Sequence, residues 1–191
     1  MNYGFFALLF RMKYIERWSL MRCNIKENLS EHSLETAILA NALAEIGNTY
    51  FNKNYNSDRI ALKALYHDAT EIMTGDMPTP VKYYDNNIRM AYAAVERCAE
   101  KKILSLLPDK LSDKYKEVFE FSDEEKLIIK SADKLSAYIK CALEVQSGNI
   151  EFSYAEKATK NALEVSECRE LKFFMENFLA AFFEPLDNIS L

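Results

Sequence analysis

Ionisable side chains gather in an otherwise apolar segment, residues 64–80, which reads ALYHDATEIMTGDMPTP. His67 and Asp68 are adjacent and Glu71 follows within a turn, so on a helix all three side chains would lean toward one region. Burying such charges singly costs on the order of several kcal/mol each. A divalent cation offsets that cost, and imidazole nitrogen and carboxylate oxygen are suitable ligands for it. The segment therefore indicates a metal site.

Two further residues are candidates for the same site. His32 is the only other histidine and opens a second apolar helix, while Asp133 lies inside the apolar stretch IIKSADKLSAYIKCAL. Together with His67 and Asp68 they come from three predicted helices and could converge on one metal. The pattern alone leaves another interpretation open, because a single helical histidine is more often a hydrogen-bonded structural residue. Asp133, beside Lys134, could equally face water.

Long helices must position these side chains, because the chain has only four Gly and four Pro and lacks useful strand-like alternation. We expect helices over residues 4–14, 28–46, 58–73, 85–107, 122–147, 154–168 and 170–183. Asn28–Glu31 and Ser122–Glu125 predict capping boxes, and Gly75 predicts a helix stop. On the 28–46 helix the inward stripe is expected to contain Leu34, Ala37, Ile38 and Ala44.

Composition narrows the class of protein. A chain of 191 residues with 49% hydrophobic residues can form one all-α domain over residues 1–191 without disulfides. The net charge of −5 and the lack of a basic run argue against a nucleic-acid polymer as partner. The four cysteines are far apart and form no CxxC, which indicates reduced thiols and a cytoplasmic location. The N-terminal apolar run is too short to span a membrane, so we expect no membrane partner.

The order His32, His67–Asp68, Asp133 resembles the H…HD…D signature of the HD-domain metal-dependent phosphohydrolases. The motifs RW at 17–18, ENLSEHSLE at 27–35, ALYHDATEIMTGDMPTPVKYY at 64–84 and SDEEKLIIKSADKLSAYIKC at 122–141 are similar to the bacterial 5′-deoxynucleotidase branch. The HD pair is generic, whereas HDATEIMTGDMPTPVK with the upstream ERW is specific. The resemblance covers almost the whole chain.

This resemblance implies a single compact HD-domain helical bundle, all-α and homodimeric. It implies hydrolysis of 2′-deoxynucleoside 5′-monophosphates, with ribonucleotides disfavoured and different bases tolerated. The implied cofactor is a divalent transition metal such as Co²⁺, Mn²⁺ or Zn²⁺. The implied metal ligands are His32, His67, Asp68 and Asp133. The implied substrate contacts are Arg17, Trp18, His32, Asp68, Asp76, Met77, Pro78, Thr79 and Asp133, and the implied catalytic residues are Glu71, Arg17 and Asp68.

Physical chemistry agrees with these roles. Four protein ligands leave about two positions open on a six-coordinate metal. Glu71, outside the ligand set, would handle a proton, either by orienting the water or by protonating the leaving group. Arg17 would fork onto the phosphate, and Trp18 would pack against the sugar where a 2′-hydroxyl clashes or stays unpaired. Lys82 could add positive potential. Without the resemblance, Arg17 reads as a solvated loop cation and Trp18 as a core anchor.

Two alternative functions stay open at this point. The first is another HD phosphohydrolase, acting on a cyclic nucleotide, a nucleoside triphosphate or an alarmone, although the local cations Arg17, Arg22 and Lys82 suit a single phosphate better. The second is a metal-stabilised helical binding module without catalysis. Replacing Glu71 by Ala separates the two classes, because a binding module has no turnover to lose.

Overall fold

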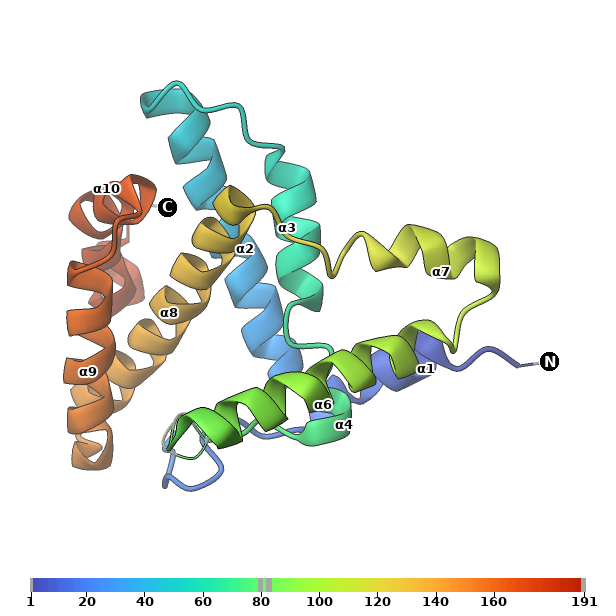
Figure 1. Cartoon of the computed structure of the whole chain (residues 1–191). Helices are drawn as coiled ribbons and strands as arrows, with labels where there is room; N and C mark the ends of the chain where they lie inside the picture. Colours follow the sequence, from blue (N-terminus) through green and yellow to red (C-terminus); the bar gives the residue numbers. More distant parts are fainter. Residues whose placement is uncertain (1, 79–80, 82–83, 190–191) are drawn as a thin grey trace. The chain divides into compact units, whose positions relative to one another are not determined.

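The computed structural model describes residues 2–78, 81 and 84–189. Within those residues it has no β-strand, only one isolated antiparallel bridge between Glu16 and Asn28, so the all-α prediction is confirmed. The helices are α1 (Phe5–Leu9), α2 (Leu29–Tyr50), α3 (Ser57–Tyr66), α4 (Glu71–Thr74), α6 (Asn86–Leu104), α7 (Asp109–Lys116), α8 (Asp123–Gln146), α9 (Ser153–Glu164) and α10 (Arg169–Asn177) (Figure 1). Short 3-10 turns complete the described chain: η1 (Phe10–Tyr14), η2 (Ile150–Phe152), η3 (Leu179–Phe183) and η4 (Leu186–Asn188).

The described residues fall into two compact units, and each is considered by itself. Unit 1 is drawn from residues 1–22, 26–34 and 65–121, and unit 2 from residues 23–25, 35–64 and 122–191. Helices α2 and α3 each begin in one unit and end in the other. The organisation of residues 1–191 as a single domain stays a prediction. Among the described residues, every helix is too short or too polar to cross a lipid bilayer.

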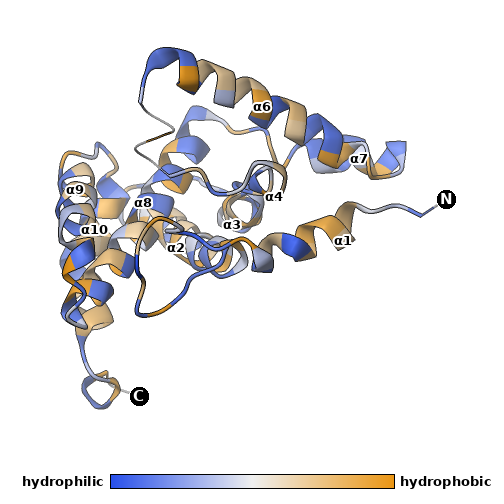
Figure 2. Cartoon of the chain, turned by 90° about the horizontal axis from the view of Figure 1, so that it is seen from below, coloured by the Kyte–Doolittle hydropathy of each residue, from blue (hydrophilic) through white to orange (hydrophobic). Residues whose placement is uncertain are grey.

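Unit 1 has a small aromatic core. Phe5, Ile103 and Leu107 are buried together, and Tyr66 and Tyr115 pack against them. Tyr115 meets Phe5 edge-on at a ring-centroid distance of 5.0 Å and Tyr66 at 6.0 Å. The five residues of α1, FFALL, are all hydrophobic (Figure 2), so burying them in this core is favourable. The α-helix ends at Leu9 and continues only as the 3-10 turn η1, so the predicted 4–14 helix is wrong in type over its second half.

Unit 2 is built around α8, which lies alongside α9 (Figure 1). Its core contains these buried residues, among others: Leu39, Leu43, Ile60, Ile128, Leu135, Leu163 and Leu171. The predicted capping box starts α8, because Ser122 Oγ accepts from the Glu125 N–H and Glu125 accepts from the Ser122 N–H. The predicted helices at 154–168 and 170–183 end earlier than expected, at Glu164 and Asn177.

The buried carboxylate of Glu144 ties a loop to the last turns of α8. It accepts from the backbone N–H groups of Asn24 and Ile25, at 2.9 and 3.0 Å, and from Asn149 Nδ2 at 2.8 Å. Lys140 lies 2.6 Å from the same carboxylate and also donates to the Ile25 carbonyl. These four donors outweigh the effect of burial and lower the pKa of Glu144 to about 2.

The start of α2 confirms the second predicted capping box. Asn28 Oδ1 accepts from the N–H groups of Ser30 and Glu31, and Glu31 accepts from the Asn28 N–H at 2.9 Å. This cap places His32 in the first turn of the helix. The inward stripe was only half right, because Ala37 and Ala44 are buried while Leu34 and Ile38 are 55% and 60% exposed.

The continuous helix predicted over residues 58–73 is wrong. Helix α3 ends at Tyr66, residues 67–70 form a turn, and α4 begins at Glu71. Within the turn, N–H groups bond three residues back rather than four, as Ala69 does to Tyr66 at 3.0 Å and Glu71 does to Asp68 at 2.9 Å. The predicted stop at Gly75 is confirmed, because α4 ends at Thr74 and Gly75 is its C-cap, where φ of 73° and ψ of 162° form a conformation that glycine readily adopts.

Candidate metal centre

The turn between α3 and α4 carries the adjacent pair His67 and Asp68. Their side chains face each other, with His67 Nε2 3.1 Å from Asp68 Oδ2. Both residues lie in the turn that follows Tyr66, outside helices α3 and α4.

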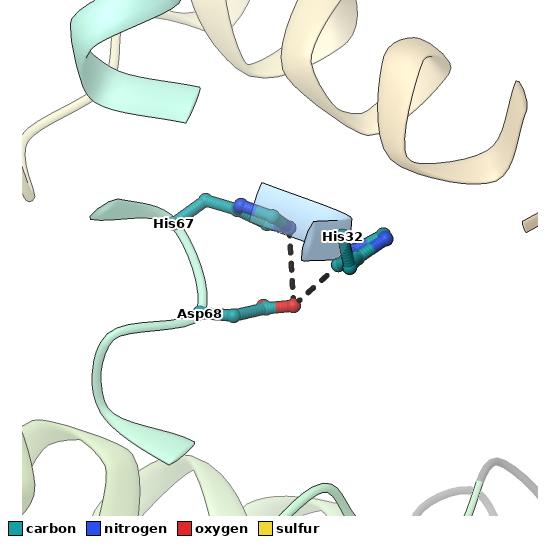
Figure 3. A group of neighbouring side chains, drawn as sticks. All are labelled: His32, His67 and Asp68. Carbon is teal, nitrogen blue, oxygen red and sulfur yellow. Dashed lines mark ion pairs between the residues drawn. The ribbon is translucent and has the colours of Figure 1, made fainter. Parts of the chain in front are cut away.

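His32 joins the pair from the first turn of α2. Its ring is fully buried, and its Nε2 lies 3.5 Å from Asp68 Oδ2. Figure 3 shows the two imidazoles converging on this one carboxylate oxygen from different elements. The ring centroids of His32 and His67 are 5.3 Å apart. Unit 1 therefore brings together three of the four predicted ligands.

The spacing of these atoms fits one cation. A ligand atom from each of His32, His67 and Asp68 lies within 4.8 Å of the other two. Two ligand atoms bound to one ion at about 2.0–2.2 Å are themselves about 3.0–3.5 Å apart, for bond angles between octahedral and tetrahedral. The observed 3.1 and 3.5 Å separations agree with that range. Two imidazole nitrogens and one carboxylate oxygen suit Zn²⁺, Co²⁺ or Mn²⁺.

Asp68 is held as an anion. Burial alone would raise the pKa of Asp68, but the contact with His67 and the electrostatic effects of His32 and Arg17 outweigh it and lower that pKa well below its usual range. Arg17 Nη1 lies 3.7 Å from Asp68 Oδ2. A charged carboxylate is the form that binds a cation.

Arg17 and Trp18 lie on the segment that forms the isolated bridge. The Arg17 N–H donates to the Glu27 carbonyl at 3.0 Å, and the Leu29 N–H donates to the Ile15 carbonyl at 2.9 Å. The Arg17 guanidinium lies 5.9 Å from the Trp18 ring centroid. Trp18 has φ of 58°, in the left-handed region that a residue with a bulky side chain rarely adopts. The backbone therefore holds these two predicted substrate contacts in an unusual, defined turn.

Glu27 is a site residue that the sequence analysis missed. Its buried carboxylate accepts from Trp18 Nε1 at 2.6 Å and lies 3.6 Å from both Arg17 Nε and His32 Nδ1. Burial alone would raise the pKa of Glu27, but the contact with His32 and the charge of Arg17 lower it. No periodicity marks this position, because its place opposite Arg17 depends on the bridge. The only available signal was its position at the start of the ENLSEHSLE motif.

Glu71 and the turn after α4 follow His67 and Asp68 closely in the sequence. Glu71, the first residue of α4, is 6% exposed, and Gly75 ends the helix. Burial raises the pKa of Asp76 above its ordinary value, with repulsion from Asp68 adding to the effect and Arg17 opposing it. Met77 and Pro78 continue this turn without helical structure, as expected from the prolines. Thr79 and Lys82 lie outside the described residues.

Asp133, the fourth predicted ligand, lies half-buried on α8 in unit 2. The other three ligands belong to unit 1. Its place in the ligand set stays a prediction.

Known proteins resemble this chain over nearly its whole length. The family model described as 5′-deoxynucleotidase YfbR-like matches residues 4–182. The chain is 47% identical over 189 residues to the 5′-deoxynucleotidase YfbR of Shigella boydii serotype 18, covering 97% of this chain and 95% of that protein.

Two solved structures share the fold. An HD-domain phosphohydrolase from Listeria innocua has a TM-score of 0.82 at 24% identity, covering 94% of this chain and 88% of that chain. The cyanophage S-2L HD phosphohydrolase DatZ, solved with dA and one catalytic Zn²⁺, has a TM-score of 0.63 at 19% identity, covering 92% and 96%. At these identities the structures support the fold alone, and they confirm the predicted HD-domain architecture.

Proposed function

Because the chain belongs to the YfbR-like 5′-deoxynucleotidase family, we propose that it removes the 5′-phosphate from 2′-deoxynucleoside 5′-monophosphates. The products are a deoxynucleoside and inorganic phosphate. The observation that carries this proposal is 47% identity over nearly the full length of a 5′-deoxynucleotidase. The convergence of His32, His67 and Asp68 supplies the matching chemistry.

His32, His67 and Asp68 would hold a divalent transition metal, with Asp133 as the proposed fourth ligand. When bound, such a cation supplies Lewis acidity toward the phosphoryl group and toward water. Zn²⁺, Co²⁺ and Mn²⁺ are the candidates, because mixed nitrogen and oxygen ligands accept each of them.

Arg17 would bind the phosphate. Its guanidinium already lies 3.7 Å from Asp68 and 3.6 Å from Glu27, so two carboxylates orient it next to the ligand group. A planar guanidinium can make two charge-assisted bonds to a phosphate, which a point charge cannot. These contacts hold the Arg17 guanidinium in place before the substrate arrives. Less side-chain entropy is then lost when the phosphate binds.

Glu71 would move the proton that hydrolysis requires. It follows Asp68 by three residues, and its N–H donates to the Asp68 carbonyl at 2.9 Å. A buried carboxyl group that does not coordinate the metal can exchange a proton with the attacking water or with the leaving 5′-oxygen. Attack by water in line on phosphorus would then break the bond to that oxygen.

Trp18 and the turn of Asp76, Met77, Pro78 and Thr79 would border the sugar. A site that leaves a 2′-hydroxyl unpaired rejects a ribonucleotide by about 1–3 kcal/mol per polar group. The left-handed backbone of Trp18 and the raised pKa of Asp76 mark both segments as unusual. Such departures from ordinary geometry and ionisation are common at functional sites.

We also propose that the enzyme is a cytoplasmic homodimer. The exposed apolar pairs Leu34 and Ile38, and Phe178 and Phe182, each four residues apart, support a protein partner, because exposed hydrophobic side chains often mark an interface. All four cysteines are free thiols, which supports a reducing compartment. Light scattering of the purified protein measures the oligomeric state, and a monomer at micromolar concentration would contradict the dimer.

A panel of monophosphates tests the proposed activity. The metal-loaded protein should release phosphate from dAMP, dGMP, dCMP and dTMP much faster than from AMP, and chelation should abolish release. Equal rates on dAMP and AMP would contradict the sugar selectivity alone. Release of pyrophosphate or triphosphate from dATP without release from dAMP would instead support a different HD phosphohydrolase.

A further inference from the structure

The side chain of Glu27 has an unusual number of functional neighbours. The bridge between Glu16 and Asn28, with the Arg17 N–H bonded to the Glu27 carbonyl at 3.0 Å, sets Glu27 opposite the Arg17–Trp18 segment. The carboxylate is 7% exposed. It is thus a buried anion placed by the backbone beside two predicted substrate contacts.

The two carboxylate oxygens of Glu27 contact different partners. Oε2 accepts from Trp18 Nε1 at 2.6 Å and lies 3.6 Å from Arg17 Nε. Oε1 faces His32 Nδ1 at 3.6 Å. One side chain therefore connects both predicted substrate contacts with a predicted metal ligand.

The contact with His32 bears on which ring nitrogen can bind a metal. His32 Nε2 points to Asp68 Oδ2 at 3.5 Å, inside the ligand group, while Nδ1 points to Glu27. A carboxylate favours the N–H form of the nitrogen that faces it, which leaves the lone pair on the other nitrogen. Glu27 thus favours the tautomer of His32 that directs Nε2 toward the cation.

The contact with Trp18 acts on the substrate side. Trp18 occupies the left-handed backbone region, which a large side chain adopts only when its surroundings hold it there. The short, charge-assisted hydrogen bond to Glu27 orients the indole ring.

We propose that Glu27 is a positioning residue that couples the Arg17–Trp18 segment to the metal ligand His32. This inference rests on the proposed function only where it treats Arg17 and Trp18 as substrate contacts. The contacts that Glu27 makes with Trp18, Arg17 and His32 do not depend on a bound nucleotide. It predicts that changes at Glu27 alter both the surroundings of the indole and the affinity for metal.

Two variants separate the contacts. Glu27→Gln keeps the size of the side chain but has one acceptor oxygen for two N–H groups, those of Trp18 and His32, so at least one contact must fail. Because the Trp18 bond is much the shorter, we expect the amide oxygen to stay with Trp18 and the amide N–H to face His32, favouring the wrong tautomer. Glu27→Ala removes both contacts.

Two readouts follow these contacts without using activity. Trp18 is the only tryptophan in the chain, so its fluorescence reports the indole environment without background. Competition with a chelator gives the affinity for Co²⁺. The matched control is Glu16→Gln, in the same bridge, where Glu16 is exposed and pairs with Lys26 at the surface.

For Glu27→Gln we expect unchanged Trp18 emission and Co²⁺ affinity reduced by about 10- to 100-fold, the usual effect of losing a residue that orients a ligand. For Glu27→Ala we expect shifted emission and reduced affinity together, and for Glu16→Gln neither. Wild-type affinity in Glu27→Gln would overturn the coupling to His32. Wild-type emission in folded Glu27→Ala would overturn the coupling to Trp18. A wild-type protein inactive on dAMP would overturn the proposed function, whereas these two readouts would still decide the role of Glu27.

Discussion

His67 Nε2 lies 3.1 Å from Asp68 Oδ2, although the two residues are neighbours in a turn and do not share a helix. Helix α3 ends at Tyr66, immediately before this pair. His32 approaches the same oxygen from α2, at 3.5 Å. The candidate metal centre is thus made where one helix starts and another stops.

Replacing Glu71 by Gln should lower kcat on dAMP by about 10²- to 10⁴-fold, because the amide cannot exchange a proton with the reacting groups. Metal content should stay at the wild-type level, since Glu71 lies outside the ligand group. Steady-state phosphate release and elemental analysis measure the two quantities. Glu120→Gln, at an exposed position, is the control. A Glu71→Gln protein with wild-type kcat would favour another proton carrier.

Arg17→Lys should reduce kcat/KM for dAMP by about 10- to 100-fold. The change keeps the positive charge but loses the fork, and a hydrogen bond to a charged group contributes about 1.5–3 kcal/mol. Arg89→Lys, on the exposed surface of α6, serves as the matched control. If lysine at position 17 supports the wild-type kcat/KM, Arg17 does not bind the phosphate through two bonds.

Gly75→Ala should destabilise the fold by about 1–3 kcal/mol, since φ of 73° and ψ of 162° lie in a region that is essentially restricted to glycine. Gly4→Ala is a matched control, because Gly4 has φ of −97° and nothing within 4 Å of an added Cβ. Urea unfolding of the two variants gives the comparison. Equal stabilities would show that the turn after α4 relaxes without cost.

Glu144→Gln should lower the free energy of unfolding at pH 7 by up to about 3 kcal/mol. The reason is that folding lowers the pKa of Glu144 from 4.5 to about 2, and the amide loses that stabilisation. The folded state binds the proton of Glu144 less tightly than the unfolded state does. The stabilisation is therefore fully present above about pH 4.5 and is lost as the pH falls through about 2. Urea titrations at several pH values measure the loss.

The control for that experiment is Glu167→Gln, at an exposed position between α9 and α10. The difference between wild type and Glu144→Gln should shrink steadily toward pH 2, while Glu167→Gln should follow wild type throughout. A pH-independent difference would mean that Glu144 stabilises the loop by packing rather than by charge.

The sequence correctly predicted features that depend only on residues close together in the chain. The capping boxes at Asn28 and Ser122 were found because a cap depends on residues only three apart. The break at Tyr66 was missed, since apolar spacing continues across residues 67–70 while the hydrogen bonds change to a tighter turn. Helix α7 was also missed, because it is mostly polar and buries none of its residues.

As with the helices, only part of the candidate site could be predicted from the sequence. His32, His67 and Asp68 could be named because rare residue types stood in apolar surroundings and in a recognisable order. Glu27 could not, because its contacts with Trp18 and His32 depend on the bridge that pairs two segments of irregular structure. Glutamate is common, and its chemical role here follows only from its neighbours.

The central claim is that one divalent cation, held by His32, His67 and Asp68, is required for release of phosphate from dAMP. Titrating metal-stripped protein with Co²⁺ while measuring bound metal and phosphate release tests it most directly. We predict activity that rises in proportion to bound metal and saturates at one ion per chain. Asp68→Asn should lose both and Asp58→Asn, at an exposed position on α3, should lose neither. Full activity in metal-stripped protein, or wild-type metal binding by Asp68→Asn, would contradict the claim.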